Sequence, residues 1–314
     1  MRPERFAFRA MGAPCALELY GEAAPELARA AIAEVERLEA RYSRYRDDSI
    51  ASAINRSAGD AQGVEVDAET ASLLDYADLL FRESGGRFDV TSGVLRRAWD
   101  FRSQRLPEPG ELAPLLARVG WPKVGWDGRR VVLPEPGMEL DFGGFVKEYA
   151  ADRVAALCRE LGARHGLVDL GGDLALVGPH PDGSPWRVGI RHPRRPGVAL
   201  AWIPLFSGGL ATSGDYERFM VVGGRRYAHL LDPRTGWPVD GLASASVAAP
   251  LCVIAGAATT IALLQPAEGG RRWLASLGLP HLCVDRELAV HGTLGDAGAL
   301  RRASASVAGQ LVQG

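Results

Sequence analysis

The stretch DFGGFVKEYAADRVAALCRELGARHGLVDLGGDLALVG (residues 141–178) predicts a helix followed by two β-strands. Between residues 145 and 162 the apolar side chains recur at three- and four-residue spacing, which is typical of a helix with one buried face. Gly162 is expected to end this helix. The segments GLVDL (166–170) and LALVG (174–178) then read as strands.

The same patterns predict elements on both sides of this stretch. Helices are expected at 25–43, 67–86, near 111–118 and at 254–264. Strands are expected at 138–140, 186–190, 200–205, 219–222 and 227–231, and hairpins near 124–133 and 281–292. Early helices followed by a long β run favour an α+β fold over a doubly wound parallel sheet. We expect a single domain over residues 1–314, whose two possible lobes would divide near 100–137.

Composition excludes several classes of protein. The chain has 314 residues, 47% hydrophobic and 24% charged, which is the mixture of a globular protein. The formal net charge of −2 gives no global attraction to nucleic acid or to an anionic membrane. The four cysteines form no CxxC pair, so free thiols are expected.

The chain shows no secretory leader, no lipobox and no apolar run long enough to span a membrane. We therefore expect a cytoplasmic location for the sequence as written. A periplasmic location is the alternative if the true start lies upstream.

Four glycine-containing clusters, each with an aspartate, are the candidate functional segments. The motifs of Rossmann enzymes, P-loop NTPases, zincins and α/β-hydrolases are absent. Glycine pairs either make turns or let the backbone approach a ligand closely. The clusters are GGRFDVTSG (85–93), DFGGFVKEYAADR (141–153), VDLGGDLALVG (168–178) and ATSGDYERF…YAHLLDPRTGWPV (211–239).

Two of these clusters carry a chemical interpretation. In the second, Asp141 follows a predicted strand and Gly143-Gly144 turn into a helix, whose N-terminus suits a phosphate. Lys147 in the first turn opposes the helix dipole, which indicates an anionic partner, although a solvent-exposed lysine is the alternative. In the fourth, His229 lies in a polar corner suited to acid–base chemistry, although a structural histidine is equally compatible.

These motifs, in this order and spacing, resemble the ApbE family of FAD:protein FMN transferases over most of the chain. The resemblance implies an α+β, T-fold-like protein of mixed, largely antiparallel sheets flanked by helices, with an FAD cleft between lobes. It implies Mg²⁺-dependent transfer of the FMN half of FAD to a threonine hydroxyl of a target flavoprotein, with release of AMP.

The resemblance also implies roles for individual residues. His229 is expected to deprotonate the accepting threonine, and Lys147 to neutralise charge on the transferred phosphate. The residues expected to contact FAD are Met11, Tyr45, Arg87, Phe88, Asp89, Asp141, Lys147, Ser213, Asp215, His229 and Leu230.

The metal site implied by the family departs from its usual pattern. The resemblance assigns the backbone carbonyl of Gly144 and the hydroxyl of Thr260, and the neighbouring Thr259 is a further candidate ligand, but Gly256 stands where the family has an aspartate. Glu148 stands where the family usually has glycine. We hypothesise that Glu148 restores the missing carboxylate, with a surface glutamate in a first helical turn as the alternative.

Three functions remain open from the sequence. The first is flavin transfer. The second is FAD pyrophosphatase activity, in which water replaces the threonine and the products are FMN and AMP. The third is a non-catalytic FAD-binding module with a degraded metal site, which Gly256 in place of the family aspartate would explain. The resemblance names FAD and a target flavoprotein as partners, and the net charge gives no reason to expect nucleic acid.

Overall fold

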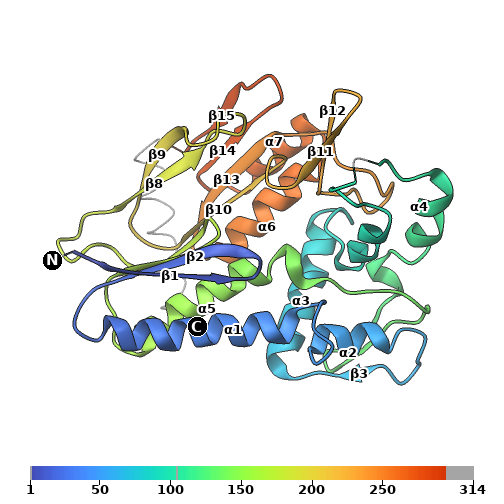
Figure 1. The fold of residues 1–314 in the computed structure, drawn as a ribbon, viewed down its shortest axis with the longest axis horizontal. Helices are drawn as coiled ribbons and strands as arrows, with labels where there is room; N and C mark the ends of the chain where they lie inside the picture. The colour runs from blue at the N-terminus through green and yellow to red at the C-terminus, as the bar shows by residue number, and fades with distance from the viewer. Residues whose placement is uncertain (1, 104, 295–314) are drawn as a thin grey trace.

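The computed structural model describes residues 2–103 and 105–294 and is built around one eight-stranded antiparallel sheet (Figure 1). The strand order is β1-β2-β6-β7-β10-β13-β14-β15, and every neighbouring pair is antiparallel. The strands are β1 (Glu4–Ala10), β2 (Ala13–Leu19), β6 (Gly166–Leu170), β7 (Asp173–Gly178), β10 (Gly209–Gly214), β13 (Ser244–Ala249), β14 (His281–Val284) and β15 (Val290–Gly292).

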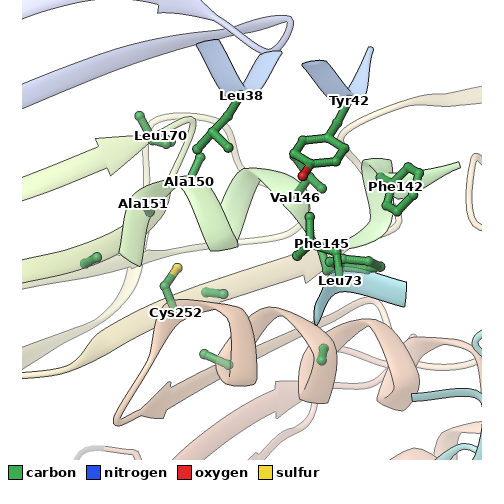
Figure 2. Packing of buried hydrophobic residues seen from close by; sticks show 14 of the residues in the cluster. Leu38, Tyr42, Leu73, Phe142, Phe145, Val146, Ala150, Ala151, Leu170 and Cys252 are labelled. Carbon is green, nitrogen blue, oxygen red and sulfur yellow. The ribbon is translucent and has the colours of Figure 1, made fainter. Parts of the chain in front are cut away.

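Four helices cover one face of this sheet in the same order as the strands beneath them. They are α1 (Ala24–Tyr42), α5 (Val146–Glu160), α6 (Cys252–Leu263) and α7 (Ala267–Ser276). Figure 2 shows α5 between α1 and α6, with Leu38 and Tyr42 of α1 on one side and Cys252 of α6 on the other. The position of α5 is therefore fixed by contacts on three sides.

A β-hairpin covers the opposite face of the sheet. It consists of β8 (Trp186–Arg191) and β9 (Ala199–Leu205). Side chains of β7 alternate between the two faces: Leu174 and Leu176 pack under this hairpin, while Ala175 and Val177 pack under the helices. The central strands are buried on both faces for this reason.

The remaining elements form a smaller region beside the helical layer. They are α2 (Ile50–Arg56), β3 (Val64–Glu65), α3 (Ala68–Glu83), the 3₁₀ helix η1 (Val90–Arg97), α4 (Pro109–Leu116), η2 (Trp121–Lys123), β4 (Gly125–Trp126), β5 (Arg130–Val132), η3 (Phe142–Gly144), β11 (Phe219–Val222) and β12 (Arg225–Ala228). A separate apolar cluster joins η1, α4 and the β11–β12 hairpin through Trp99.

Most predicted elements are present, and the expected α+β class is confirmed. The helices expected at 25–43, 67–86 and 145–162 match α1, α3 and α5, and the side chain of Asp67 caps α3. The four cysteines are free and buried, as expected.

Two strand predictions are wrong. Residues 138–140 form no strand, because Asn55 takes the place of a neighbouring strand: its side chain accepts from the Leu140 N–H at 2.7 Å and donates to the Leu140 carbonyl at 3.0 Å. The strand expected at 227–231 ends at Ala228, so His229 follows the strand instead of lying on it.

The single-domain prediction for residues 1–314 stays a prediction, and residues 295–314 of that range lie outside the described part. Within residues 2–103 and 105–294, no helix combines the length and apolar character that a membrane span requires.

Helix α6 is capped by a side chain from α5. Asp152 accepts hydrogen bonds from the backbone N–H groups of Cys252 at 2.8 Å and Val253 at 2.9 Å. The residue that precedes α6, Leu251, offers no side-chain cap. The carboxylate of Asp152 therefore satisfies two N–H groups at the N-terminus of α6 and fixes where that helix begins relative to α5.

We expect Asp152→Ala to lower the free energy of unfolding by about 1–2 kcal/mol, as for the loss of other helix N-caps. Urea unfolding at neutral pH measures the change. The control is Asp47→Ala, which removes an exposed carboxylate and should change stability by less than about 0.5 kcal/mol. Equal effects of the two substitutions would show that the cap contributes nothing.

Candidate functional site

Segment 87–88 connects two of the predicted functional segments. The ring of Phe88 lies against Gly144, where an added Cβ would stand 2.9 Å from the ring. The neighbouring side chain, Arg87, donates to the Leu264 carbonyl at 3.2 Å and lies 3.7 Å from a carboxylate oxygen of Asp232. One short segment therefore touches both the turn before α5 and the corner that contains His229.

Lys147 points toward the sheet and forms an ion pair inside the protein. Its Nζ contacts the buried carboxylate of Asp173 and donates to the Leu170 carbonyl at 3.3 Å. The other carboxylate oxygen of Asp173 accepts weakly from the Thr212 N–H at 3.4 Å. The anionic partner that the position of Lys147 predicts is thus present within the chain, at the start of β7.

Asp141 is held by an arginine that the sequence analysis did not single out. Arg44 forms an ion pair with the Asp141 carboxylate and donates to the Tyr45 hydroxyl at 2.9 Å. The other Asp141 oxygen accepts from the Gly143 N–H at 3.0 Å, which caps the short η3 turn. Tyr45 is 76% exposed, and the Arg44 guanidinium lies over its ring at 5.0 Å from the centroid, so a planar ligand would stack on the other face of the ring.

His229 is held in one tautomer by the backbone. The backbone N–H of His229 donates to the Arg218 carbonyl at 2.9 Å, and the ring Nδ1 lies 3.2 Å from the same oxygen. A carbonyl oxygen only accepts, so Nδ1 carries the proton and Nε2 keeps its lone pair. Desolvation lowers the pKa of His229 below its ordinary value near 6.5, which keeps the ring neutral at pH 7.

The β1–β2 hairpin tip lies beside the same segment. Met11 and Gly12 both have positive φ, 50° and 74°, as a tight two-residue hairpin requires. A Cβ at Gly12 would stand 3.8 Å from the guanidinium of Arg218. The expected site residue Met11 therefore lies near the segment that holds His229. Leu230, the next residue, packs against the main core.

Three hydroxyl groups meet between β10 and α6. Ser213 Oγ lies 2.9 Å from Thr259 Oγ1 and 3.3 Å from Thr260 Oγ1. Thr259 also donates to the Gly256 carbonyl at 2.9 Å. These three hydroxyls thus form one oxygen-rich cluster on the face of α6 that points toward β10.

Glu148 is buried against Gly256 of α6. Its side chain fills the space that a side chain at position 256 would occupy: an added Cβ there would stand 2.6 Å from Glu148 Cγ and 2.9 Å from Oε1. Burial raises the pKa of Glu148 above its ordinary value near 4.5. The alternative of a surface glutamate is therefore wrong, because only 8% of this residue is exposed.

Two expected ligand-binding aspartates use their carboxylates inside the fold. Asp89 accepts from the N–H and hydroxyl of Thr91 and from the Trp121 N–H. Asp215 is held by both terminal nitrogens of Arg194, at 2.6 and 2.7 Å. Both side chains are buried, so they position the segments around them and have no free oxygen for a ligand in this arrangement.

Sequence reasoning missed the partners of the predicted residues, namely Arg44, Asp173, Arg194 and Arg218. Asp173 lies in the quoted motif VDLGGDLALVG, so its position was marked although its pairing with Lys147 was not.

In the described parts of the chain, no three histidine, cysteine or acidic side chains gather into a metal-binding group.

Comparisons with known proteins identify what this chain is similar to. The family model described as the ApbE family matches residues 11–283. The Haemophilus influenzae protein named FAD:protein FMN transferase is 32% identical over 234 residues, which are 71% of this chain and 68% of that protein. A Treponema pallidum protein of the same name is 30% identical over 82% of this chain and 80% of its own length. The crystal structure of the ApbE protein from Thermotoga maritima superimposes with a TM-score of 0.85, at 29% identity, covering 93% of this chain and 97% of its own.

We expect Gly256→Ala to lower the free energy of unfolding by about 1–2 kcal/mol, because the new methyl group overlaps Glu148. In a Glu148→Ala background the same change should instead be stabilising by about 0.5–1 kcal/mol, through helix propensity alone. Chemical unfolding of the four proteins measures this double-mutant cycle.

The matched control is Gly110→Ala in α4, where an added Cβ meets nothing within 4 Å. This change should be neutral or stabilising in both backgrounds. An additive cycle at 256 and 148 would show that the two positions do not share one space.

Proposed function

The chain belongs to the ApbE family, and on that premise we propose that it is an FAD:protein FMN transferase. In the proposed reaction, a threonine hydroxyl of a target flavoprotein attacks the phosphorus of the FMN half of FAD. The bond from that phosphorus to the bridging oxygen of the diphosphate breaks, and AMP leaves. The flavin remains attached to the threonine through a phosphodiester.

The observation that carries this proposal is the contact of segment 87–88 with both functional segments. Phe88 lies against Gly144, and Arg87 lies beside Asp232, three residues after His229. Phosphate binding at the N-terminus of α5 and a base at His229 are useful for the same reaction only if the two lie near one another. These contacts support one shared site for the diphosphate.

We assign charge neutralisation to the N-terminal end of α5. The free N–H groups of that end and the ammonium of Lys147 favour a diphosphate. The partly exposed side chain of Lys147 is held by Asp173, which orients the ammonium before a ligand binds. Asp141, oriented by Arg44, and the exposed Tyr45 are the proposed contacts to the rest of FAD.

We assign the general base to Nε2 of His229. Because Nδ1 donates to the Arg218 carbonyl, the lone pair lies on the other nitrogen. The lowered pKa keeps that nitrogen unprotonated near neutral pH, so it is able to accept the threonine proton. The proton passes from the hydroxyl to Nε2 as the new P–O bond forms.

The residues between α5 and α6 fit a magnesium ion. Mg²⁺ prefers oxygen ligands, is usually bound by one or two carboxylates, and keeps several waters alongside substrate phosphates. The hydroxyls of Thr259 and Thr260 and the Gly144 carbonyl are the proposed oxygens, and the buried carboxyl of Glu148, with one unpartnered oxygen, packs against α6 at Gly256. When bound, the ion would neutralise charge that develops on the diphosphate.

Incubation with FAD, Mg²⁺ and a flavoprotein fragment that carries the acceptor threonine tests this function. We expect fluorescent flavin on the fragment and AMP in equal amount, and no flavin on a fragment with valine at the acceptor position. Free FMN and AMP without labelled acceptor would mean a pyrophosphatase. Bound but unchanged FAD would mean a non-catalytic binding module. The glycine at position 256, in place of the family aspartate, is the sequence feature that favours this alternative.

We expect His229→Gln to lower the transfer rate by about 10²–10⁴-fold, as for the loss of a general base. The acid limb of the kcat/KM profile of the wild type should lie below pH 6.5, because the pKa of His229 is lowered and the base stays unprotonated further into acid. Initial rates of acceptor labelling between pH 5 and 8 measure both effects.

His165→Gln is the matched control, because His165 also bonds a backbone carbonyl, that of Pro179 at 2.8 Å, away from the proposed site. Its rate should equal that of the wild type. A His229→Gln protein with unchanged rate, or an acid limb above pH 6.5, would contradict the assignment of the base.

A further inference from the structure

Glu148 has a buried carboxyl oxygen without a partner. Only 8% of the residue is exposed, and Oε2 is fully covered yet makes no hydrogen bond in the described structure. Buried polar atoms are almost always satisfied, so an exception calls for a specific reason. A carboxyl group in this state needs either a proton or a positive partner.

The nearest lysine in the sequence forms no direct ion pair with this carboxyl, although its charge acts on it from a distance. Lys147 is the preceding residue, but its Nζ contacts Asp173 and the Leu170 carbonyl on the sheet side of α5. Consecutive helical residues point about 100° apart, so the two side chains leave α5 in different directions. Among the described residues, no arginine, lysine or histidine forms an ion pair with Glu148.

Glu148 instead faces the oxygen-rich side of α6. Residues 256, 259 and 260 lie within one turn of that helix and share a face. Glu148 contacts this face at Gly256, and the hydroxyls of Thr259 and Thr260 extend from it beside Ser213. A carboxyl group from α5 and a cluster of three hydroxyls from α6 and β10 therefore meet the same turn of α6, at residues 256–260.

We propose that Glu148 is the carboxylate ligand of the divalent cation in this protein, reaching it from α5 across the bare backbone of Gly256. This inference rests on the proposed function, since it assumes the metal-assisted reaction. It adds the residue that holds the ion and the reason for glycine at 256. The unpartnered Oε2 is the oxygen available to the cation.

A purely structural role explains these contacts less well. A buried carboxyl with one oxygen unsatisfied costs stability, and an apolar side chain of similar size would fill the same space without that cost. Glycine also has a lower helix propensity than alanine, so the residue that makes room for Glu148 is itself unfavourable in α6. The chain carries both costs at one contact, and cation binding gives a use for both.

Binding of Mn²⁺ alone, measured by the electron paramagnetic resonance signal of the free ion, tests the proposal without catalysis. We expect Glu148→Gln to weaken Mn²⁺ binding at least about tenfold, the lower bound for losing even an outer partner of a metal ligand. Glu160→Gln, which changes an exposed glutamate at the end of the same helix, should bind as the wild type does. Equal affinity of Glu148→Gln and wild type, or no binding by the wild type, would overturn the proposal.

The second test moves the carboxylate to the facing helix. This test remains usable if the Glu148→Gln protein folds poorly. Glu148→Ala should lose Mn²⁺ affinity, and adding Gly256→Asp should recover it, because the new side chain enters the space that Glu148 leaves. Failure to recover affinity in a folded double variant would overturn the proposal.

Quenching of FAD fluorescence in the absence of metal separates this inference from the proposed function. If Glu148→Gln and wild type bind Mn²⁺ equally while FAD still binds, only the role of Glu148 fails. If the wild type does not bind FAD, the proposed function itself fails.

Discussion

The packing of α5 against α6 is the constraint on which the rest of the site depends. Within six residues, α5 makes two polar contacts and one packing contact: Lys147 pairs with Asp173 of β7, Asp152 caps the N-terminus of α6, and Glu148 packs against Gly256 of α6. A rotation or shift of α5 would break all three together. The absence of a side chain at position 256 lets the two helices approach closely enough for these contacts to form.

The sequence predicted those elements whose burial pattern is periodic and apolar. Helices α1, α3 and α5 each bury one face, so their spacing was informative. Strands β10 and β13 (GLATSG and SASVAA) were not predicted, because small residues have little strand propensity and are buried on both faces, which removes the alternation. The false strand at 138–140 has a strand-like sequence, but its bonding partner is the side chain of Asn55, which no local pattern reveals.

For the candidate site too, the sequence identified residues that stand in a local pattern and missed the partners that only the fold brings to them. Residue types and glycine spacing pointed to Lys147, Asp141 and His229, because a lysine in a first helical turn and a glycine-rich turn into a helix are local features. Their partners lie far away in the sequence: Arg44 is 97 residues from Asp141, and Asp173 is 26 residues from Lys147. Pairings of that kind follow from the sheet and helix order, so only the fold identifies them. Asp89 and Asp215 match the motifs, but their carboxylates bind Thr91 and Arg194 within the fold. For these two residues the local pattern predicted a ligand contact where the fold has an internal one.

Lys147 and Glu148 are adjacent in the sequence, and they differ in how the fold treats their charges. The lysine has a carboxylate partner, and its end remains partly open to solvent, so its position is compatible with a stable protein that has no ligand. The glutamate is buried with an oxygen left over, a condition that stability alone does not favour. Native folds carry such costs mainly where a ligand or reaction compensates for them. The unsatisfied glutamate, more than the satisfied lysine, is therefore the residue that marks where this protein binds something beyond its own chain.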